Sequence, residues 1–428
     1  MNINRHKLLN LSTWKNKQPR MPLLLKGARQ VGKTFLIREF GKQFPHFHEI
    51  NFQKNPELKE IFKTTNDPLK IKEYLEIFFN TKIHLESDLI FFDEIQDCPE
   101  ALNSLKFFSE NLPHSFIVGA GSLLGIYLST HTFPVGKVEF LDLHPLSFCE
   151  FLEAHHKNNL ADLTKTLTPQ INVFHQTLVD EMKKFMIIGG MPKVVSTFIE
   201  TESYQEARLV QEHLLLSYKS DFSKYSGPVD ALKILSVFDN IPKQLAKDNK
   251  KFQFNLLQKG ARYAQFQSAI DWLKSAGLCY KVPILTHAEI PLKVYIEENA
   301  FKIYFFDTGL LGALSDLPVS TFLNPSDLFK TFKGAFSENF FLQEFYSQRK
   351  ENLYSWQSNT AEVDFLYANE NELCPIEVKS GESGRLKSLG VFCDKYHVKW
   401  RRKCTLLPLE IREDTHIKNL PLYLSALI

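Results

Sequence analysis

Closely spaced cysteine pairs are missing from this sequence. Its six cysteines are scattered, with no C-x-x-C pair among Cys98, Cys149, Cys279, Cys374, Cys393 and Cys404. This spacing argues against a structural zinc site and against a disulfide framework, so we expect reduced thiols. The sequence also lacks an apolar run of membrane-spanning length, and its first residues lack a hydrophobic signal core. We therefore expect a cytoplasmic protein with no membrane partner.

A large excess of charge of either sign is also missing. The net charge is +2 for 428 residues, which neither requires nor excludes a nucleic-acid partner. The composition, with 44% hydrophobic residues and 37 phenylalanines, is that of a globular protein with large aromatic cores. At this length we expect roughly two to four domains.

A glycine-containing stretch follows the first strongly apolar run. Residues 23–35 read LLLKGARQVGKTF, which fits the G-x-x-x-x-G-K-[ST] pattern between an expected strand and an expected helix. The glycines let backbone N–H groups surround a phosphate, and the helix N-terminus adds partial positive charge. We expect Lys33 to reach the β- and γ-phosphates of ATP and Thr34 to bind Mg²⁺. The predicted nucleotide-binding residues are Gly27, Ala28, Arg29, Gln30, Val31, Gly32, Lys33, Thr34 and Phe35.

A pair of carboxylates follows a second buried-strand run. Residues 89–92 are apolar and lead directly into Asp93 and Glu94. This is the Walker B arrangement, in which Asp93 holds Mg²⁺ through water and Glu94 orients and deprotonates the attacking water. A third strand-like run, 115–118, is followed by Ser122, which we expect to help Glu94 hold that water.

Strand-like and helix-like segments alternate over residues 23–145. This order predicts an α/β fold with a parallel sheet, helices on both faces, and a ligand at the carboxyl ends of the strands. The expected strands are 22–26, 47–52, 88–92, 115–118 and 137–142, and the expected helices are 33–43, 67–79, 99–112 and 144–155.

The middle of the chain has a different pattern. Helical periodicity up to residue 225 predicts a helical lid, and helices at 229–240 and 263–276 followed by strands at 278–285 and 294–296 suggest a winged helix-turn-helix. The second of these helices is not strongly basic, so DNA binding and a spacer or docking role remain equally supported. Two prolines and little periodicity place a domain boundary at 313–330. The predicted domains are an ATPase core (1–155), a lid (156–225), a winged-helix-like domain (226–315) and a C-terminal domain (330–428).

Four charged residues in the last third form a second candidate site. Glu338 lies on an amphipathic helix, and Asp364 and Glu377 lie on strand-like segments, with Lys379 two residues after Glu377. Because side chains alternate along a strand, Glu377 and Lys379 share a face. Carboxylates around Mg²⁺ with a nearby lysine suit phosphodiester hydrolysis. The alternatives are a salt bridge at a sheet edge, or a nuclease fold kept only for binding.

Basic residues lie downstream of this site. Arg385 and Lys387 are followed by 395–403, the most basic stretch of the chain, with aromatic residues interleaved. Such a stretch could grip a phosphate backbone, although a lone run of charge is more often a solvated face.

Several phrases of the sequence resemble a large prokaryotic family of AAA-type ATPases with a C-terminal domain of unknown function. They include GARQVGKT at 27–34, FFDEIQ at 91–96, VGAGSLL at 118–124, HPLSFCEFL at 144–152, GGMP at 189–192 and FKIYFFDTGLL at 301–311, with GAFSENF, AEVDFLY and PIEVKSG in the last third. The resemblance implies an ATPase core, a lid, a winged-helix-like middle and a C-terminal domain similar to the PD-(D/E)xK, or restriction-endonuclease-like, nuclease fold. The resemblance predicts the domain architecture more specifically than it predicts the function.

One departure concerns arginine. No arginine occurs between Arg38 and Arg208, the interval in which ring-forming AAA-type ATPases carry an arginine finger. Lys137 is the cation nearest the expected place, and we expect it to act in cis or in trans on the γ-phosphate. The absence puts a standard hexameric ring in doubt, while a homo-oligomer remains open.

The sequence thus predicts an ATP-binding and ATP-hydrolysing regulatory protein that uses Mg²⁺. Its nucleotide state would control a C-terminal nuclease-like domain that interacts with DNA. The alternative is an ATP-dependent switch whose C-terminal domain only binds nucleic acid or protein. A helicase or motor ranks last, because no helicase motif accompanies the two Walker elements.

Overall fold

The structure is a computed structural model that describes residues 3–130, 136–247, 249–323, 330–349, 351–370, 372–381 and 387–428. The chain divides into two compact units. The N-terminal unit contains Arg5–His144 with Ser275–Gly277, and the C-terminal unit contains mainly Pro145–Lys274 and Leu278–Ile428. Each unit is described by itself.

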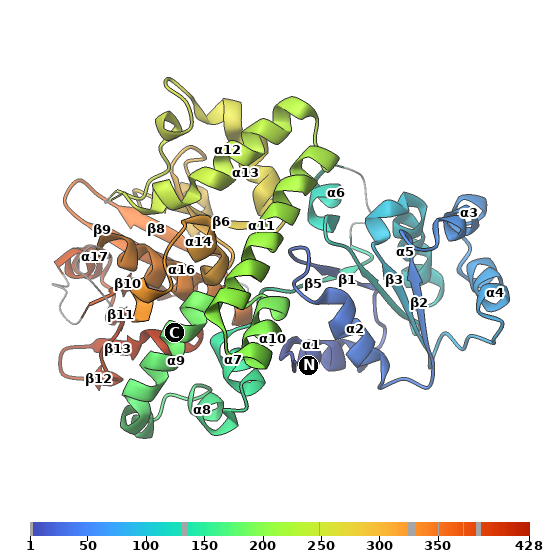
Figure 1. Ribbon diagram of the computed structural model, residues 1–428, viewed down its shortest axis with the longest axis horizontal. Helices are drawn as coiled ribbons and strands as arrows, with labels where there is room; N and C mark the ends of the chain where they lie inside the picture. Colours follow the sequence, from blue (N-terminus) through green and yellow to red (C-terminus); the bar gives the residue numbers. More distant parts are fainter. Residues whose placement is uncertain are drawn as a thin grey trace. The chain divides into compact units, whose positions relative to one another are not determined.

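A parallel five-stranded sheet forms the centre of the N-terminal unit (Figure 1). Its order is β2-β3-β4-β1-β5, and β4 therefore lies between β1 and β3. Every residue of β3 and β4 is buried, as expected for a parallel sheet covered on both faces. The strands are β1 (Leu23–Lys26), β2 (Phe47–Asn51), β3 (Leu89–Asp93), β4 (Phe116–Ala120) and β5 (Glu139–Asp142).

One helix of this unit, α4 (Pro68–Phe79), begins and ends at local sequence signals. Asp67 accepts a hydrogen bond from the Leu69 N–H (3.0 Å) at the start of the helix, and Asn80 ends that helix in a left-handed conformation. The helices are α1 (Lys7–Lys15), α2 (Lys33–Gly41), α3 (Lys59–Thr64), α4 (Pro68–Phe79), α5 (Pro99–Asn111) and α6 (Leu124–Thr130), with short 3₁₀ helices η1 (Pro56–Leu58) and η2 (Ile95–Asp97).

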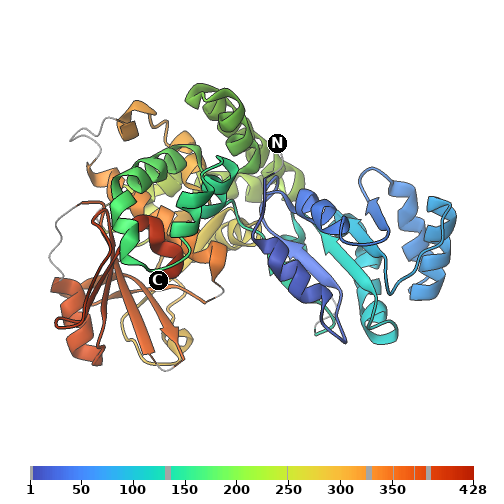
Figure 2. The ribbon, with the colours of Figure 1, turned by 90° about the horizontal axis from the view of Figure 1, so that it is seen from below.

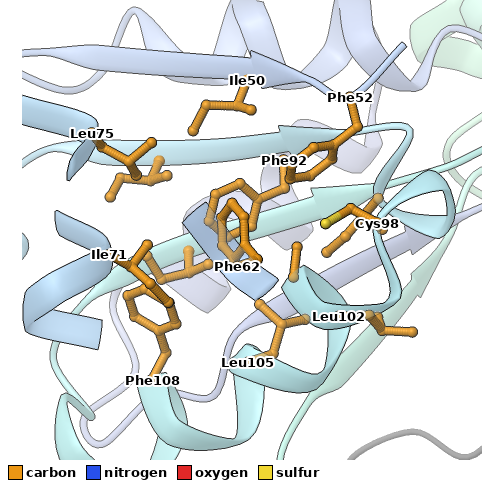
Figure 3. Close-up of a cluster of buried hydrophobic side chains, with 14 of the residues drawn as sticks. Ile50, Phe52, Phe62, Ile71, Leu75, Phe92, Cys98, Leu102, Leu105 and Phe108 are labelled. Carbon is orange, nitrogen blue, oxygen red and sulfur yellow. The ribbon is translucent and has the colours of Figure 1, made fainter. Parts of the chain in front are cut away.

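The hydrophobic core of the N-terminal unit lies between the sheet and helices α3, α4 and α5. Figure 3 shows Phe92 of β3 and Phe52, which directly follows β2, meeting Phe62 and Phe108 from the helices. The Phe62 and Phe92 rings are 5.4 Å apart in an edge-to-face arrangement, which aromatic pairs favour. This aromatic core holds β3 in place, and with it the carboxylates at the end of that strand.

The C-terminal unit begins with helices and continues into a mixed sheet. Its first helix starts at Phe148, later than the predicted 144, because Ser147 and Glu150 form a capping box there. The helices are α7 (Phe148–Ala154), α8 (Asn158–Leu163), α9 (His175–Ile188), α10 (Pro192–Thr201), α11 (Tyr204–Tyr225), α12 (Pro228–Leu245), α13 (Tyr263–Ser275), α14 (Thr308–Leu314), α15 (Ser320–Leu323), α16 (Lys330–Gln348) and α17 (Lys387–Tyr396), with 3₁₀ helices η3 (Pro169–Phe174), η4 (Phe254–Leu256), η5 (Leu292–Tyr295) and η7 (Leu422–Leu427).

Eight strands form the sheet of the C-terminal unit, in the order β12-β13-β11-β10-β9-β8-β6-β7. In Figure 2 the orange to red strands of the last third of the chain lie side by side in this sheet. The strands are β6 (Cys279–Leu285), β7 (Phe301–Phe305), β8 (Tyr354–Gln357), β9 (Glu362–Asn369), β10 (Glu372–Val378), β11 (Arg401–Thr405), β12 (Glu410–Arg412) and β13 (Ile417–Pro421).

The hairpin predicted for the winged-helix-like region differs from the observed one. Residues 294–296 are not a strand: Val294 is 72% exposed and lies in η5. The antiparallel partner of β6 is β7, whose five residues are all buried. The buried apolar run of β7 therefore pairs in place of the exposed one. In addition, β6 pairs with β8, so the sheet continues across the predicted boundary at 313–330, of which residues 324–329 lie outside the described residues.

Buried polar side chains fix α16, the helix that carries Glu338. Asn339 accepts a hydrogen bond from the Phe305 N–H of β7 (2.8 Å), and Glu344 accepts one from the Phe148 N–H of α7 (2.8 Å). Because buried polar groups cost free energy unless they are paired, these bonds specify one position for the helix. They place Glu338 close to β7 and define its orientation.

The phrases GGMP and FFDTG meet at a second buried contact. The Asp307 carboxylate accepts hydrogen bonds from the Gly190 N–H (2.6 Å) and from the Leu310 N–H at the start of α14. A Cβ at Gly189, which has φ +76°, would lie 2.2 Å from the Asp307 carboxylate, so only glycine fits. These distinctive motifs are therefore part of the frame of the C-terminal unit.

Candidate functional site

The loop between β1 and α2 has the backbone that a phosphate-binding loop requires. Gly27 and Gly32 have φ values of 145° and 100°, which side chains rarely adopt. A Cβ at Gly27 would lie 2.2 Å from the Leu143 carbonyl oxygen, so this position accepts only glycine. Gly32 is the N-cap of α2, which directs the first N–H groups of the helix toward the loop.

The Lys33 amine lies over this loop. It donates hydrogen bonds to the carbonyl oxygens of Gly27 (2.8 Å) and Ala28 (3.0 Å). Burial lowers the pKa of Lys33 to about 8, against the opposing effect of Glu94 and Asp93. A polyphosphate in the loop would supply the missing negative charge, favour the ammonium form and exchange weak carbonyl contacts for charged ones.

Thr34 and Asp93 meet at the carboxyl ends of the strands. The Thr34 hydroxyl lies 3.2 Å from both Asp93 carboxylate oxygens, and the Asn51 amide donates to Asp93 at 2.9 Å. Burial, and then the charge of Glu94, raise the pKa of Asp93. A hydroxyl and a carboxylate in contact form an oxygen donor set that suits Mg²⁺, and a cation there would relieve the strain on the ionised Asp93.

Glu94 is held by groups from its own turn and from the end of β4. The Gln96 amide donates to Glu94 Oε2 at 2.8 Å, and both the N–H and the hydroxyl of Ser122 donate to the same oxygen at 3.2 and 3.3 Å. The structure thus brings Ser122 to Glu94, as the sequence predicts. Glu94 itself has a left-handed backbone, with φ 51°, which turns the chain sharply after β3.

The sequence reading missed three residues of this region. Asn51 donates to Asp93, and Gln96 donates to Glu94. Arg5 donates to the carbonyl oxygens of Val31 (2.9 Å) and His144 (2.6 Å), which joins the loop to the residues that follow β5. Asn51 ends β2 and lies opposite Asp93 in the parallel strand pair, but an amide at a strand end has no distinctive sequence pattern. Nothing in the local sequence marks Arg5.

The remaining predicted loop residues line its outer side. Arg29 and Gln30 are exposed, and Gln30 has φ 63°. Phe35, in the first turn of α2, is 37% exposed, and Val31 is buried with its carbonyl bonded to Arg5. The Arg29 and Gln30 side chains therefore lie on the solvent-exposed part of the loop that would surround a nucleotide.

Lys137 lies at the amino ends of the parallel strands, whereas Lys33 lies at their carboxyl ends. Glu139, the first residue of β5, pairs with Leu23, the first residue of the parallel strand β1, so Lys137 precedes the amino end of its strand. Its amine forms an ion pair with Glu110 at 2.9 Å. The geometry within one chain therefore does not support the expected cis contact with a γ-phosphate, and only the trans alternative remains a prediction.

The C-terminal unit places Asp364, Glu377 and Lys379 side by side, and Glu338 lies on a helix near enough for its charge to act on Asp364. Glu338 is on α16, Asp364 on β9 and Glu377 on β10, where Phe365 pairs with Ile376 and sets the two acidic residues side by side. The Val378 N–H donates to Asp364 Oδ2 at 2.9 Å, and Lys379 is paired with Glu377 at 2.5 Å.

Three further residues of this cluster come from the segment before the predicted domain boundary. Lys250 forms an ion pair with Glu338 Oε1, and the Tyr304 hydroxyl of β7 donates to Glu338 Oε2 at 2.8 Å. Lys302, also on β7, is paired with Glu362 at 2.5 Å. The sequence reading assigned these residues to another domain, and β7 to no strand at all, so it had no signal that could join them to the cluster.

The charges of the cluster determine its protonation. Burial, followed by the charges of Glu377 and Glu338, raises the pKa of Asp364 to about 8. Burial also opposes ionisation of Glu338, but Lys250 and Lys302 outweigh it and lower the pKa of that carboxyl. Burial works against the charge of Lys379, yet Asp364 and Glu377 raise its pKa. At neutral pH the raised pKa favours the protonated form of Asp364, because burial and the charges of the neighbouring carboxylates both oppose its ionisation.

One oxygen of the cluster has no hydrogen-bond partner. Glu377 Oε2 is buried and unpaired, although its other oxygen contacts Lys379. A buried carboxylate oxygen without a partner is costly, and a cation bound there would satisfy it. Carboxylate oxygens are the ligands that Mg²⁺ and Mn²⁺ prefer, but in the described part of the chain the ligand atoms of Glu338, Asp364 and Glu377 do not all lie within 4.8 Å of one another.

The basic stretch at 395–403 is partly engaged in contacts of its own. Lys395 lies 5.6 Å from the Trp356 ring, and Arg401 forms an ion pair with Asp394 at 3.3 Å. Lys387 is exposed at the start of α17, and Arg385 lies outside the described residues. These contacts agree with a solvated face and give no separate sign of a nucleic-acid site.

Comparison with protein families divides the chain into three parts. Residues 19–152 match a family model described as an AAA domain. Residues 179–321 and 333–424 match models described as domains of unknown function, DUF8612 and DUF4143. This confirms the expected AAA-type ATPase domain and a C-terminal domain of unknown function, and it adds a second domain of unknown function where the sequence predicts a lid and a winged-helix-like domain. None of the curated proteins searched matches the chain.

Solved structures give weaker likenesses. A Walker-type ATPase of Pyrococcus abyssi is 14% identical, with 74% of this chain and 96% of that chain covered and a TM-score of 0.46. The Aeropyrum pernix ORC1 protein, solved in complex with DNA, is 11% identical, with 76% and 95% covered and a TM-score of 0.31. Drosophila ORC bound to DNA is 16% identical, with 72% and 94% covered and a TM-score of 0.25. Such values do not establish a shared function.

Among the described residues, no helix combines sufficient length with sufficient apolar character to cross a membrane.

Proposed function

We propose that this protein binds ATP with Mg²⁺ at the loop of residues 27–35 and hydrolyses it. The observation that carries this proposal is the convergence of three groups at one edge of the sheet. Lys33 covers the loop, Thr34 contacts Asp93, and Ser122 and Gln96 fix Glu94. The match of residues 19–152 to an AAA domain supports it independently.

Each of these side chains has a distinct task. The loop N–H groups and the Lys33 ammonium bind the phosphates, while Thr34 and Asp93 supply oxygen ligands for Mg²⁺, which would neutralise charge on the phosphates. Glu94 accepts a proton from the attacking water. Gln96 and Ser122 both bind Glu94 Oε2, so Oε1 is the oxygen directed to that role.

We further propose that the C-terminal cluster is a nuclease-like centre whose state depends on the bound nucleotide. Its support is the placement of Glu338, Asp364, Glu377 and Lys379 on one helix and two adjacent strands, with a buried unpaired oxygen on Glu377. Glu377 and Asp364 would hold a divalent cation, and Lys379 would stabilise charge on a phosphodiester. DNA is the substrate class that this chemistry suits.

The second candidate function is a switch without nuclease activity. The observation that favours it is the set of lysines that already neutralise the cluster, Lys250, Lys302 and Lys379. In this case the C-terminal unit would only hold nucleic acid or protein. The winged-helix-like segment would be a docking element, since its hairpin strands belong to a larger sheet.

Cleavage of supercoiled plasmid and of branched DNA with Mn²⁺ separates the two candidates. We expect cleavage that changes when ATP is added, and that disappears both in Asp364→Ala and in Glu377→Gln. Lys33→Ala is the control that removes the nucleotide response while keeping the cluster intact. Complete absence of cleavage with ATP, with ADP and without nucleotide would leave the switch as the function.

A further inference from the structure

Three residues at the end of α13 belong to the same compact unit as the nucleotide-binding loop. Ser275–Gly277 group with Arg5–His144, whereas the residues on either side, Lys274 and Leu278, belong to the C-terminal unit. We call Ser275–Gly277 the α13 end. It comes from the segment that the sequence predicts to be winged-helix-like, far along the chain from the loop of residues 27–35. Its contacts within the N-terminal unit show what holds it there.

The backbone of Gly277 packs against the phosphate-binding loop. A Cβ at Gly277 would lie 3.2 Å from the Ala28 nitrogen and 3.6 Å from the Gly27 carbonyl carbon. Glycine therefore lets the two backbones approach closely. The carbonyl oxygens of Gly27 and Ala28 are the groups that hold the Lys33 amine. Gly277 thus contacts the part of the loop that Lys33 would release on turning to a bound phosphate.

The carbonyl group of Ser275 packs against the other half of the site. A Cβ at Gly125 would lie 2.1 Å from the Ser275 carbonyl oxygen, so the first turn of α6 lies as close to that oxygen as glycine allows. Gly125 follows shortly after Ser122, which binds Glu94 through its N–H and its hydroxyl. The α13 end therefore contacts both the phosphate-binding loop and the element that orients Glu94.

The geometry of a helix terminus fixes the α13 end. Gly277 has φ +73°, and the Leu278 N–H donates to the Leu273 carbonyl oxygen at 2.9 Å, which is the hydrogen bond of a Schellman motif. The next residue, Cys279, begins β6, which pairs with β7 and with β8. The α13 end is therefore joined through the chain directly to the eight-stranded sheet that carries the acidic cluster.

We propose that the α13 end is a positioning element of the nucleotide site, and that nucleotide binding acts through it on β6. The inference rests on the proposed ATP binding and names the element through which the nucleotide state reaches the C-terminal unit. Coupling between two sites is reciprocal. A nucleotide that favours the packed α13 end is therefore bound more tightly when that end is packed, although Gly277 and Ser275 act only through the loop and α6.

Gly277→Ala tests the contact in the full-length protein, with Gly260→Ala as its matched control. Both glycines have positive φ values, +73° and +77°, so an added Cβ strains both backbones alike. Only the Cβ at Gly277 meets the loop, since in the described part of the chain nothing lies within 4 Å of a Cβ at Gly260. We expect Gly277→Ala to lower the affinity for ATP by about ten-fold, and Gly260→Ala to retain it.

Turnover separates this role from a general loss of stability. Neither substitution contacts Glu94, so turnover at saturating ATP should be retained in both variants, and only the affinity of Gly277→Ala should fall. Nucleotide titration and a phosphate-release assay measure the two quantities. Affinity and turnover that fall together, and equally in Gly277→Ala and Gly260→Ala, would show that backbone strain alone is responsible and would overturn the proposal.

Hydrogen exchange of the wild type covers the case in which Gly277→Ala does not fold. A non-hydrolysable ATP analogue with Mg²⁺ should slow amide exchange of residues 276–282 by about ten-fold, the factor that reciprocity requires. Exchange in α9, another helix of the C-terminal unit, is the control and should not change.

The outcomes distinguish the inference from the function on which it rests. Suppose that the wild type binds ATP. If Gly277→Ala then binds ATP as tightly as Gly260→Ala, or if exchange of residues 276–282 does not respond to the analogue, the nucleotide site stands and the inference is wrong. If the wild type binds neither ATP nor the analogue, the proposed function is wrong and the inference fails with it.

Discussion

The two carboxylate-bearing sites of this protein differ in how they are neutralised. At the N-terminal site, Asp93 and Glu94 contact hydroxyl and amide groups, and the single nearby ammonium, Lys33, is hydrogen-bonded to neutral carbonyl oxygens. In the C-terminal cluster, lysines contact the carboxylates directly. The first site leaves its positive charge available for an anionic ligand, whereas the second balances its charges internally.

This difference shows what each site requires of a ligand. The N-terminal loop gains charged contacts when a polyphosphate arrives and loses only weak bonds to carbonyl groups. The C-terminal cluster must give up existing ion pairs before a cation binds, so binding there is an exchange. A site of the first kind binds readily, while a site of the second kind is suited to control.

The largest effect on ATP affinity should come from Lys33→Ala. The variant removes the cation that faces the β- and γ-phosphates, and we expect ATP affinity to fall by about 100-fold or more. Fluorescent nucleotide titration measures it, with the Mn²⁺ affinity of the C-terminal cluster as the control for folding. A variant that hydrolyses ATP as well as the wild type would contradict the assignment of the loop.

Glu94→Gln should separate binding from chemistry. The amide keeps the shape of the side chain and cannot accept the proton of the attacking water, so turnover should fall by about 10²- to 10⁴-fold with ATP affinity retained. A coupled phosphate-release assay beside the nucleotide titration measures both. Equal losses in affinity and turnover would show that Glu94 acts only through the structure of the site.

Lys137→Ala tests the trans contact. If Lys137 of a second copy stabilises charge on the γ-phosphate, hydrolysis should slow, by up to about 10³-fold, with ATP affinity nearly intact. Glu110→Gln is the matched control, because it removes the ion-pair partner of Lys137 and keeps the lysine. An unchanged rate in Lys137→Ala would show that no finger acts from this position.

The stability of the C-terminal unit should depend on pH through Glu344. Burial raises the pKa of Glu344 from 4.5 to about 8, so the folded state holds a proton that the unfolded state releases. The stabilisation is complete below pH 4.5 and is lost as the pH rises to about 8, by up to about 4 kcal/mol. Urea unfolding at pH 5 and pH 8.5 should show this loss in the wild type and not in Glu344→Gln. The exposed Glu413→Gln serves as control, and a loss in Glu344→Gln equal to that of the wild type would refute the assignment.

Asp364→Ala should have the smallest effect on stability and the clearest effect on metal binding. The carboxylates around Asp364 repel one another, and its pKa is raised to about 8, so its removal should leave the melting temperature of the metal-free protein equal or slightly higher. Any Mn²⁺-induced stabilisation and any cleavage should be lost. A structural salt-bridge role predicts instead a lower melting temperature and no change in metal response.

The sequence predicted most where the relevant residues are close together along the chain. The loop from Gly27 to Thr34 is one continuous motif, and Asp93-Glu94 follows its strand directly, so local pattern and strand order were sufficient to place them. Asn51 and Gln96 could not be predicted, because amides near strand ends have no distinctive sequence pattern.

The C-terminal cluster could be predicted only in part. Glu338, Asp364, Glu377 and Lys379 follow a recognisable order, but Lys250 is 88 residues from Glu338 and belongs to a segment with no regular structure. Its contact with Glu338 joins segments far apart along the chain, which alternation of side chains cannot reveal. The prediction of a strand at 294–296 was wrong for a related reason. Short apolar runs are alike in the sequence, and the one that pairs with β6 is the buried run of β7.

Counting bound Mn²⁺ by electron paramagnetic resonance, with and without ATP, tests the central claim that the chain carries two separate cation sites. The account predicts one Mn²⁺ per chain without ATP and two with ATP. Lys33→Ala should lose only the ATP-dependent ion, and Asp364→Ala only the ATP-independent one. A wild type that binds Mn²⁺ only together with ATP, and an Asp364→Ala variant with the same count, would contradict the account and leave the C-terminal cluster as a network of salt bridges.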